Sequence, residues 1–147
     1  MQVTLSQKIN APLRTVFTVF TDFMNMEKNL SGVKRIDFLE GEGQPIVGMC
    51  WRETREIFGK EATEEMCISS IDAPHTYEVT AHSHGMIYKS TFNFKKAGKG
   101  TLVSLQFDGF PQTFGAKVAN MFSWMIAGTT KKAFVKDILD LKKICEN

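Results

Sequence analysis

The chain has 147 residues, of which 43% are hydrophobic and 23% are charged. This composition is that of an ordinary soluble globular domain, and it excludes a disordered or fibrous chain. The 18 basic and 16 acidic residues are spread along the sequence and give a formal charge of +2, so no basic face for nucleic acid is expected. The length predicts a single domain over residues 1–147.

The N-terminal part predicts a strand followed by two short helices. Apolar and polar residues alternate over Gln2–Asn10, as in a half-buried strand, and Ala11-Pro12 ends the alternation. Apolar residues then recur at helical spacing over Leu13–Phe20, with Pro12 suited to the first turn. A second short helix is expected within Phe23–Leu30.

Six further strands are predicted, because short runs with strand character are separated by Gly, Pro, Asp or Lys turns. Their short connections make them antiparallel neighbours. The six runs are Val33–Leu39, Met49–Phe58, Glu61–Ile71, Thr76–Ser83, Met86–Lys95 and Thr101–Phe107.

A long amphipathic helix is predicted from Thr113 onward, where apolar residues keep a three-and-four spacing. The segment Gly128–Thr130 is its weakest point and could mark a kink or a close approach, since glycine costs about 1 kcal/mol relative to alanine inside a helix. No other predicted element is long enough to cover the apolar face of an open sheet. The predicted fold class is therefore α+β: a helix-grip fold, in which a curved antiparallel sheet of about seven strands wraps around the C-terminal helix and leaves a cavity.

The cysteines Cys50, Cys67 and Cys145 are odd in number and far apart in the sequence, which favours reduced thiols in a cytoplasmic protein. Polar residues in the first twenty positions argue against a signal peptide. The most apolar later segment, Val118–Thr129, is shorter than the ~20 residues of a membrane span. We expect no membrane span and no cofactor, and a homodimer stays open.

Two neighbouring strands are expected to bring charged residues to the apolar face of the sheet, because side chains two apart share a face. Trp51 brings Glu53 and Arg55 with it, and Met66 brings Glu64. A tight turn at Gly59-Lys60 would pair Arg55 with Glu64. Three interpretations stay open: ordinary surface ion pairs, a buried network that anchors a ligand, and an acid/base group for catalysis.

The remaining candidate cavity residues are apolar or aromatic, apart from Ser90 and the hydroxyl of Tyr88. Such residues are also common in a plain core. Tyr88 is the most notable, since its hydroxyl can reach a ligand oxygen while its ring packs. The candidates are Tyr77, Tyr88, Ser90, Phe92, Val103 and Leu105 on strands, and Phe114, Val118, Met121, Phe122 and Met125 on the helix.

His82 and His84 are spaced to point the same way, but they fall opposite the apolar set of their strand and lack a third ligand. No metal site is therefore expected, although Gly85 could bulge and turn His84 inward. The glycine-rich segments Gly41–Gly48 and Gly109–Gly115 are candidate flaps over the cavity mouth, or two ordinary loops.

Five features together carry a family resemblance that covers the whole chain. They are the opening strand into Ala11-Pro12, the helix with Val16 and Phe17, the segment Gly48–Arg55, the hairpin Phe58–Met66 and the closing helix. The chain resembles the START-like superfamily, also called the Bet v 1-like or SRPBCC group, and within it the polyketide cyclase/dehydrase and lipid-transport type. The resemblance implies the helix-grip fold and a cavity for hydrophobic small molecules. It implies no catalytic residue, because such families share no single catalytic motif.

The leading hypothesis is a protein that binds a small hydrophobic or amphipathic molecule in this cavity, with transport of that molecule as a further role. An alternative is a cyclase or dehydratase that acts on a polyketide-like or aromatic substrate through Glu53, Glu64 or Tyr88. A third is a protein-interaction module without a small ligand, which a large exposed apolar patch on the outer sheet face would favour.

Overall fold

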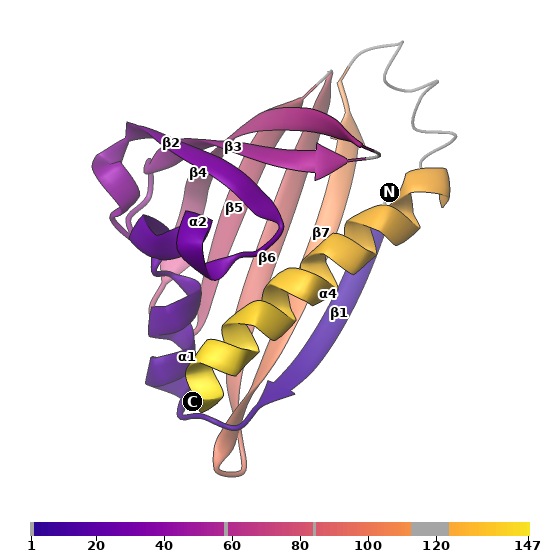
Figure 1. The fold of residues 1–147 in the computed structure, drawn as a ribbon. Helices are drawn as coiled ribbons and strands as arrows, with labels where there is room; N and C mark the ends of the chain where they lie inside the picture. The colour runs from indigo at the N-terminus through magenta and orange to yellow at the C-terminus, as the bar shows by residue number, and fades with distance from the viewer. Residues whose placement is uncertain (1, 58, 84, 113–123) are drawn as a thin grey trace.

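A curved antiparallel sheet of seven strands wraps around one long C-terminal helix, α4 (Trp124–Glu146), in this computed structural model (Figure 1). The structure describes residues 2–57, 59–83, 85–112 and 124–147. The strand order is β1-β7-β6-β5-β4-β3-β2. The strands are β1 (Gln2–Ile9), β2 (Val33–Glu40), β3 (Cys50–Ile57), β4 (Lys60–Asp72), β5 (Thr76–Ser83), β6 (Met86–Ala97) and β7 (Gly100–Pro111).

Short helices occupy the connections at the N-terminal side of the chain. α1 (Leu13–Phe20), η1 (Phe23–Asn25) and α2 (Met26–Asn29) lie between β1 and β2, and η2 (Gly41–Gly43) follows β2. The predicted helix-grip fold is confirmed in its element types and their order. α4 continues through Gly128 without a break, while residues 113–123 of the predicted helix lie outside the described part of the chain.

An aromatic cluster fills part of the space between the short helices and the sheet. The rings of Phe17 and Phe20 on α1 meet Phe94 on β6 edge to face, with centroids 5.2 and 5.3 Å apart. Tyr77 on β5 lies parallel to Phe92 on β6 at 4.8 Å. Because α1 packs against the sheet at this cluster, the cavity lies beside the cluster.

The β3–β4 hairpin differs from its predicted register by two residues. Glu64 lies opposite Glu53 rather than opposite Arg55, which faces Ala62. The last pair before the turn is Ile57 with Lys60, and Gly59 takes the left-handed backbone conformation at φ 75°. A shift by an even number of residues keeps every side chain on its face, so the predicted inner residues remain inner.

The predicted loop Gly109–Gly115 starts later than expected. Strand β7 extends to Pro111, so Gly109 belongs to the sheet rather than to a flap, and residues 113–115 lie outside the described chain. β7 is longer than predicted because its end pairs with β6, Met86 lying opposite Pro111. None of the described helices has the length and apolar character needed to cross a membrane.

Two of the three cysteines form a disulfide, so the predicted reduced state is wrong for them. Cys50 on β3 lies directly opposite Cys67 on β4, and their sulfurs are joined on the outer face. The hairpin brings together two residues that are 17 positions apart, which the sequence spacing alone does not show. Cys145 is free and buried in α4. The cysteines therefore no longer support the prediction of a cytoplasmic location.

Reduction of the disulfide is expected to lower the free energy of unfolding by about 3 kcal/mol, because it releases a closed loop in the unfolded chain. Urea unfolding with and without dithiothreitol measures this difference. The double variant Cys50→Ser/Cys67→Ser should show no response to the reductant.

Intact mass after alkylation in denaturant is the direct check on the thiols. One adduct is expected without reductant, on Cys145, and all three cysteines should react after reduction. Three adducts without reductant would contradict the disulfide.

Candidate functional site

A cavity of about 470 Å³ lies between the concave face of the sheet and α4. Its walls come mainly from apolar and aromatic side chains of β3–β7, the short helices and α4. Nine of the residues proposed from the sequence border it: Trp51, Glu53, Arg55, Glu64, Met66, Tyr77, Tyr88, Ser90 and Phe92. The sheet therefore places the predicted charged residues and the predicted aromatic residues around the same cavity.

Two predicted strand residues do not border the cavity. Val103 and Leu105 lie in the closed core, with exposed fractions of 0% and 1%, because they pack in the same cluster as Ile9 and Val16. Phe107, further along the same face of β7, borders the cavity in their place. The face of β7 was predicted correctly, but its pattern does not show where the core ends and the cavity begins.

The predicted helical residues of the cavity wall are not among the described side chains. Phe114, Val118, Met121 and Phe122 lie outside the described residues, as does the side chain of Met125. Among the described side chains of α4, those that border the cavity are Thr129, Thr130, Ala133, Phe134, Lys136, Asp137, Ile138 and Leu141.

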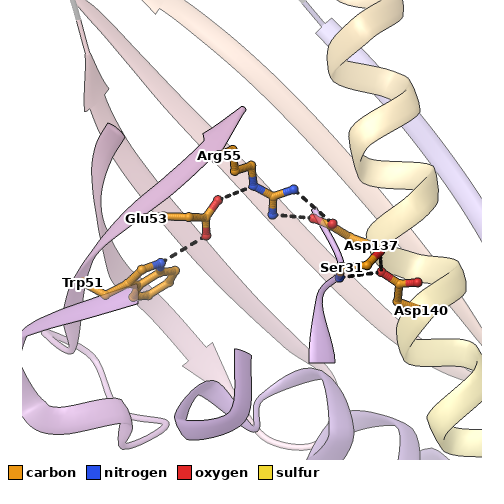
Figure 2. Close-up of polar contacts among 6 residues, drawn as sticks. All are labelled: Ser31, Trp51, Glu53, Arg55, Asp137 and Asp140. Atoms are coloured by element: carbon orange, nitrogen blue, oxygen red, sulfur yellow. Dashed lines mark hydrogen bonds and ion pairs between the residues drawn. The ribbon is translucent and has the colours of Figure 1, made fainter. Parts of the chain in front are cut away.

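A chain of polar contacts runs from the sheet to α4 across this space (Figure 2). The indole Nε1 of Trp51 donates to Oε1 of Glu53 at 3.3 Å, and Nε of Arg55 donates to Oε2 of Glu53 at 2.7 Å. Arg55 also donates from its two terminal nitrogens to both oxygens of Asp137, at 3.1 and 2.7 Å. One guanidinium therefore binds two carboxylates, one from the same strand and one from the helix.

Glu53, Arg55 and Asp137 are buried, so the contact between Glu53 and Arg55 is not an ordinary surface ion pair. The exposed fractions of the side chains are 7% for Glu53, 18% for Arg55 and 15% for Asp137. Buried ions are tolerated where hydrogen bonds replace their hydration, as the fork of Arg55 does here. A second contact lies beside it, where the backbone N–H and hydroxyl of Ser31 donate to Asp140 (Figure 2).

Asp137 was missed in the sequence reading, although a signal for it exists. It lies three residues after Phe134 and four before Leu141, so it shares the buried face of α4 with them. A buried acidic residue on the apolar face of a helix needs a basic partner. That partner is Arg55, which the strand pattern predicted to face inward.

The protonation of this group is set by opposing effects. Burial raises the pKa of Asp137, the bond to Arg55 lowers it, and Glu53 raises it again, with a net rise from its ordinary value. Burial alone would lower the pKa of Arg55, but Glu53 and Asp137 outweigh it and raise it. The guanidinium therefore stays charged at all ordinary pH values.

Glu64 and Tyr88 form a second polar region of the cavity wall. Burial raises the pKa of Tyr88, and the nearby Glu64 raises it further, so the phenol stays protonated. The ring of Tyr88 stacks on Phe107 with centroids 5.5 Å apart. Gly109 permits this position, since a Cβ there would lie 3.2 Å from the ring.

His82 is exposed on the outer side of β5, as its position in the strand predicted, and His84 lies outside the described residues. In the part of the chain that the structure describes, no group of three His, Cys, Asp or Glu residues is placed to hold a metal ion.

A family model described as polyketide cyclase / dehydrase and lipid transport matches residues 1–143. The chain belongs to this family. No curated protein matches the sequence. This family membership agrees with the resemblance found in the sequence.

Several solved structures are similar to this chain in fold. The aromatase/cyclase Zhui from Streptomyces sp. R1128 is similar with a TM-score of 0.82 and 13% identity, over 99% of this chain and 93% of that one. Truncated norcoclaurine synthase from Thalictrum flavum gives 0.76 and 14%, over 98% and 92%. The di-domain aromatase/cyclase BexL is similar with a TM-score of 0.76 and 15% identity. The match covers 100% of this chain and 50% of the BexL chain. At such identities the similarity shows the fold.

Replacing Arg55 with methionine is expected to lower the free energy of unfolding by about 3 kcal/mol or more at pH 7, because two buried carboxylates lose their cation. The matched control is Arg52→Met on the outer face of the same strand. Arg52 bonds Glu65 at 2.8 Å with side chains 42% and 59% exposed, so its loss should cost less than about 1 kcal/mol. Urea unfolding measures both values.

The pH dependence gives a second readout of the same variant. Without Arg55, burial and Glu53 act unopposed to raise the pKa of Asp137 further. The folded state then binds a proton more tightly than the unfolded chain, so Arg55→Met should regain stability as the pH falls from 7 toward 5. Equal losses in the Arg55 and Arg52 variants at both pH values would contradict the buried network.

Proposed function

We propose that this protein binds a small hydrophobic or amphipathic molecule in the cavity between the sheet and α4. The observation that carries the proposal is a cavity of about 470 Å³ whose walls are mostly apolar and include a few charged groups. Small-molecule sites have this form and typically measure about 300–1,000 Å³. The apolar walls would hold the body of the ligand, and the charged groups would orient it.

The aromatic walls are held in place before a ligand arrives. Trp51 stacks on Phe23 at 5.5 Å, and the indole is further fixed by its bond to Glu53. Tyr77 is held between Phe92, at 4.8 Å, and Phe23, at 5.8 Å. Because these rings fix one another, little side-chain entropy remains to be lost on binding.

Catalysis of the cyclase or dehydratase kind is the second candidate. It is favoured by a specific arrangement: the protonated hydroxyl of Tyr88 and the carboxyl of Glu64 border the same cavity as Asp137, whose pKa is raised. A donor and an acidic group on one apolar space are the elements of proton transfer. The structurally similar aromatase/cyclase and norcoclaurine synthase are consistent with such a use of the fold.

The protein-interaction alternative has less support. Within the described residues, the large apolar side chains that are exposed on strands are Leu39 and Phe110, on β2 and β7. The outer face of the sheet carries Arg52, Glu65 and His82 at its centre. A broad apolar patch, which that function needs, is not formed there by the described side chains.

Filling the cavity should weaken ligand binding while the protein stays folded. Ala81 lies on the cavity wall between Met66 and Tyr88, and Ala81→Phe should weaken binding of the uncharged fluorophore N-phenyl-1-naphthylamine by about tenfold or more, since it occupies the space of the dye. The matched control is Thr80→Phe, the adjacent position with the opposite orientation, which should leave the dissociation constant unchanged. Fluorescence titration measures both.

Equal affinity in the two variants, or no saturable dye binding to the unmodified protein, would contradict a ligand cavity. Native mass spectrometry of protein from its own cells then identifies the ligand, and incubation of that ligand with the protein distinguishes binding from turnover. Tyr88→Phe should retain the ligand and stop turnover if the protein is an enzyme.

A further inference from the structure

One long side of α4 faces away from the sheet (Figure 1). We propose that this side is a docking surface for an anionic lipid bilayer, with which the helix makes a peripheral contact. The proposal concerns the outside of the protein and goes beyond the ligand cavity. Three observations carry it.

The first observation is a row of exposed side chains along this side of α4. Its members recur at spacings of three and four residues, so they lie on one face of the helix. We call this row the α4 stripe. Its residues, all of them exposed, are Lys132, Val135, Lys136, Leu139 and Lys143.

The second observation is that the charges of α4 are sorted between its two sides. Each acidic side chain in the described part of the helix is bound within the protein. The lysines of the stripe, in contrast, form no ion pair with any described residue. The acidic residues and their partners are Asp137 with Arg55, Asp140 with Ser31, and Glu146 with Lys142.

The surroundings of α4 do not offset the charge of the stripe. β1 and α1 pack beside the helix, and neither contains Asp or Glu. Their charged residues are Lys8 and Arg14, both basic and exposed. All 16 acidic residues of the sequence lie within the described part of the chain, so the remaining residues add no negative charge. The helix therefore forms a local basic surface on a chain whose formal charge is only +2.

The third observation favours a bilayer over other anionic partners. Val135 and Leu139 are 38% and 47% exposed among the lysines of the stripe. A nucleic acid needs only the lysines. A bilayer takes lysines at its anionic headgroups and apolar side chains at the boundary with the acyl chains. The α4 stripe offers both.

A second group of lysines shows the contrast. Lys95, Lys96 and Lys99 are exposed at the turn between β6 and β7. No large apolar side chain is exposed among them, although this whole turn is described. The turn therefore provides a matched control for charge alone.

The stripe also adjoins the cavity, because Lys136 borders both. A protein docked along the stripe would hold its cavity beside a source of amphipathic molecules. This consequence rests on the proposed function, whereas the docking surface itself does not.

Co-sedimentation with lipid vesicles tests the docking surface. The protein should bind phosphatidylcholine vesicles with about 30% phosphatidylglycerol at least about thirtyfold more tightly than vesicles of phosphatidylcholine alone, at about 0.1 M salt. Lys132→Gln/Lys143→Gln should weaken binding to the anionic vesicles about tenfold or more, since each lysine near such a surface contributes about fivefold. Lys95→Gln/Lys96→Gln removes the same charge from the β6–β7 turn and should change the affinity less than about threefold.

Leu139→Gln tests the apolar part of the contact. It should weaken binding to the anionic vesicles about fivefold, because the side chain no longer enters the apolar boundary. The matched control is Leu39→Gln on β2, where the leucine is 40% exposed, and it should leave the affinity unchanged. Far-UV circular dichroism checks that the four variants stay folded.

Equal losses in the two lysine variants, or equal binding to both kinds of vesicle, would overturn the proposal. Loss of binding in Lys132→Gln/Lys143→Gln with full binding in Leu139→Gln would show a purely electrostatic surface, as for a nucleic acid or an acidic protein, and would also overturn it. The dye titration that tests the cavity is independent of these results, so the docking surface and the proposed function can fail separately.

Discussion

The contact of Arg55 with Glu53 and Asp137 is the constraint on which the rest of the site depends. It is a polar link between the concave sheet and the long helix across a space that is otherwise mostly apolar. An apolar contact at this place would pull α4 onto the sheet and fill the space. A charged link with fixed length and direction can instead hold the two layers at a distance, and the cavity is then a consequence of how they are joined.

The same link explains why the charged face of β3 tolerates burial. Glu53 and Asp137 share one guanidinium, and Trp51 supplies a further donor to Glu53. The cost of removing these ions from water is therefore offset by hydrogen bonds in a definite geometry rather than by general polarity. A site of this kind restricts what else can enter the cavity, because its donors are already directed to its own carboxylates.

The sequence predicts the fold well, because the signals for it are local. Alternation shows each strand, three-and-four spacing shows α4, and strand parity places Glu53, Arg55 and Glu64 inward. The features that the sequence did not predict depend on contacts between distant segments of the chain. The partner of Arg55 is Asp137, 82 positions away. Helical spacing places Asp137 on the buried face of α4, but it does not show which strand residue Asp137 meets.

The sequence pattern also does not predict where the closed core ends and the cavity begins. Val103 and Phe107 share one face of β7 and look equivalent in the pattern, but one lies under the core cluster and the other borders open space. The disulfide was missed for a related reason: its two halves meet through the register of a hairpin, which the position of the turn decides and which was predicted two residues out.

The disulfide between Cys50 and Cys67 has an effect on the opposite face of the sheet. A slip of β3 against β4 by two residues would leave every side chain on its own face, so the hydrophobic pattern alone offers weak resistance to it. That slip would set Arg55 opposite Glu64 and separate Glu64 from Glu53. The disulfide on the outer face excludes this slip. Two sulfur atoms that do not border the cavity therefore determine which charged residues of β3 and β4 lie opposite each other on the inner face.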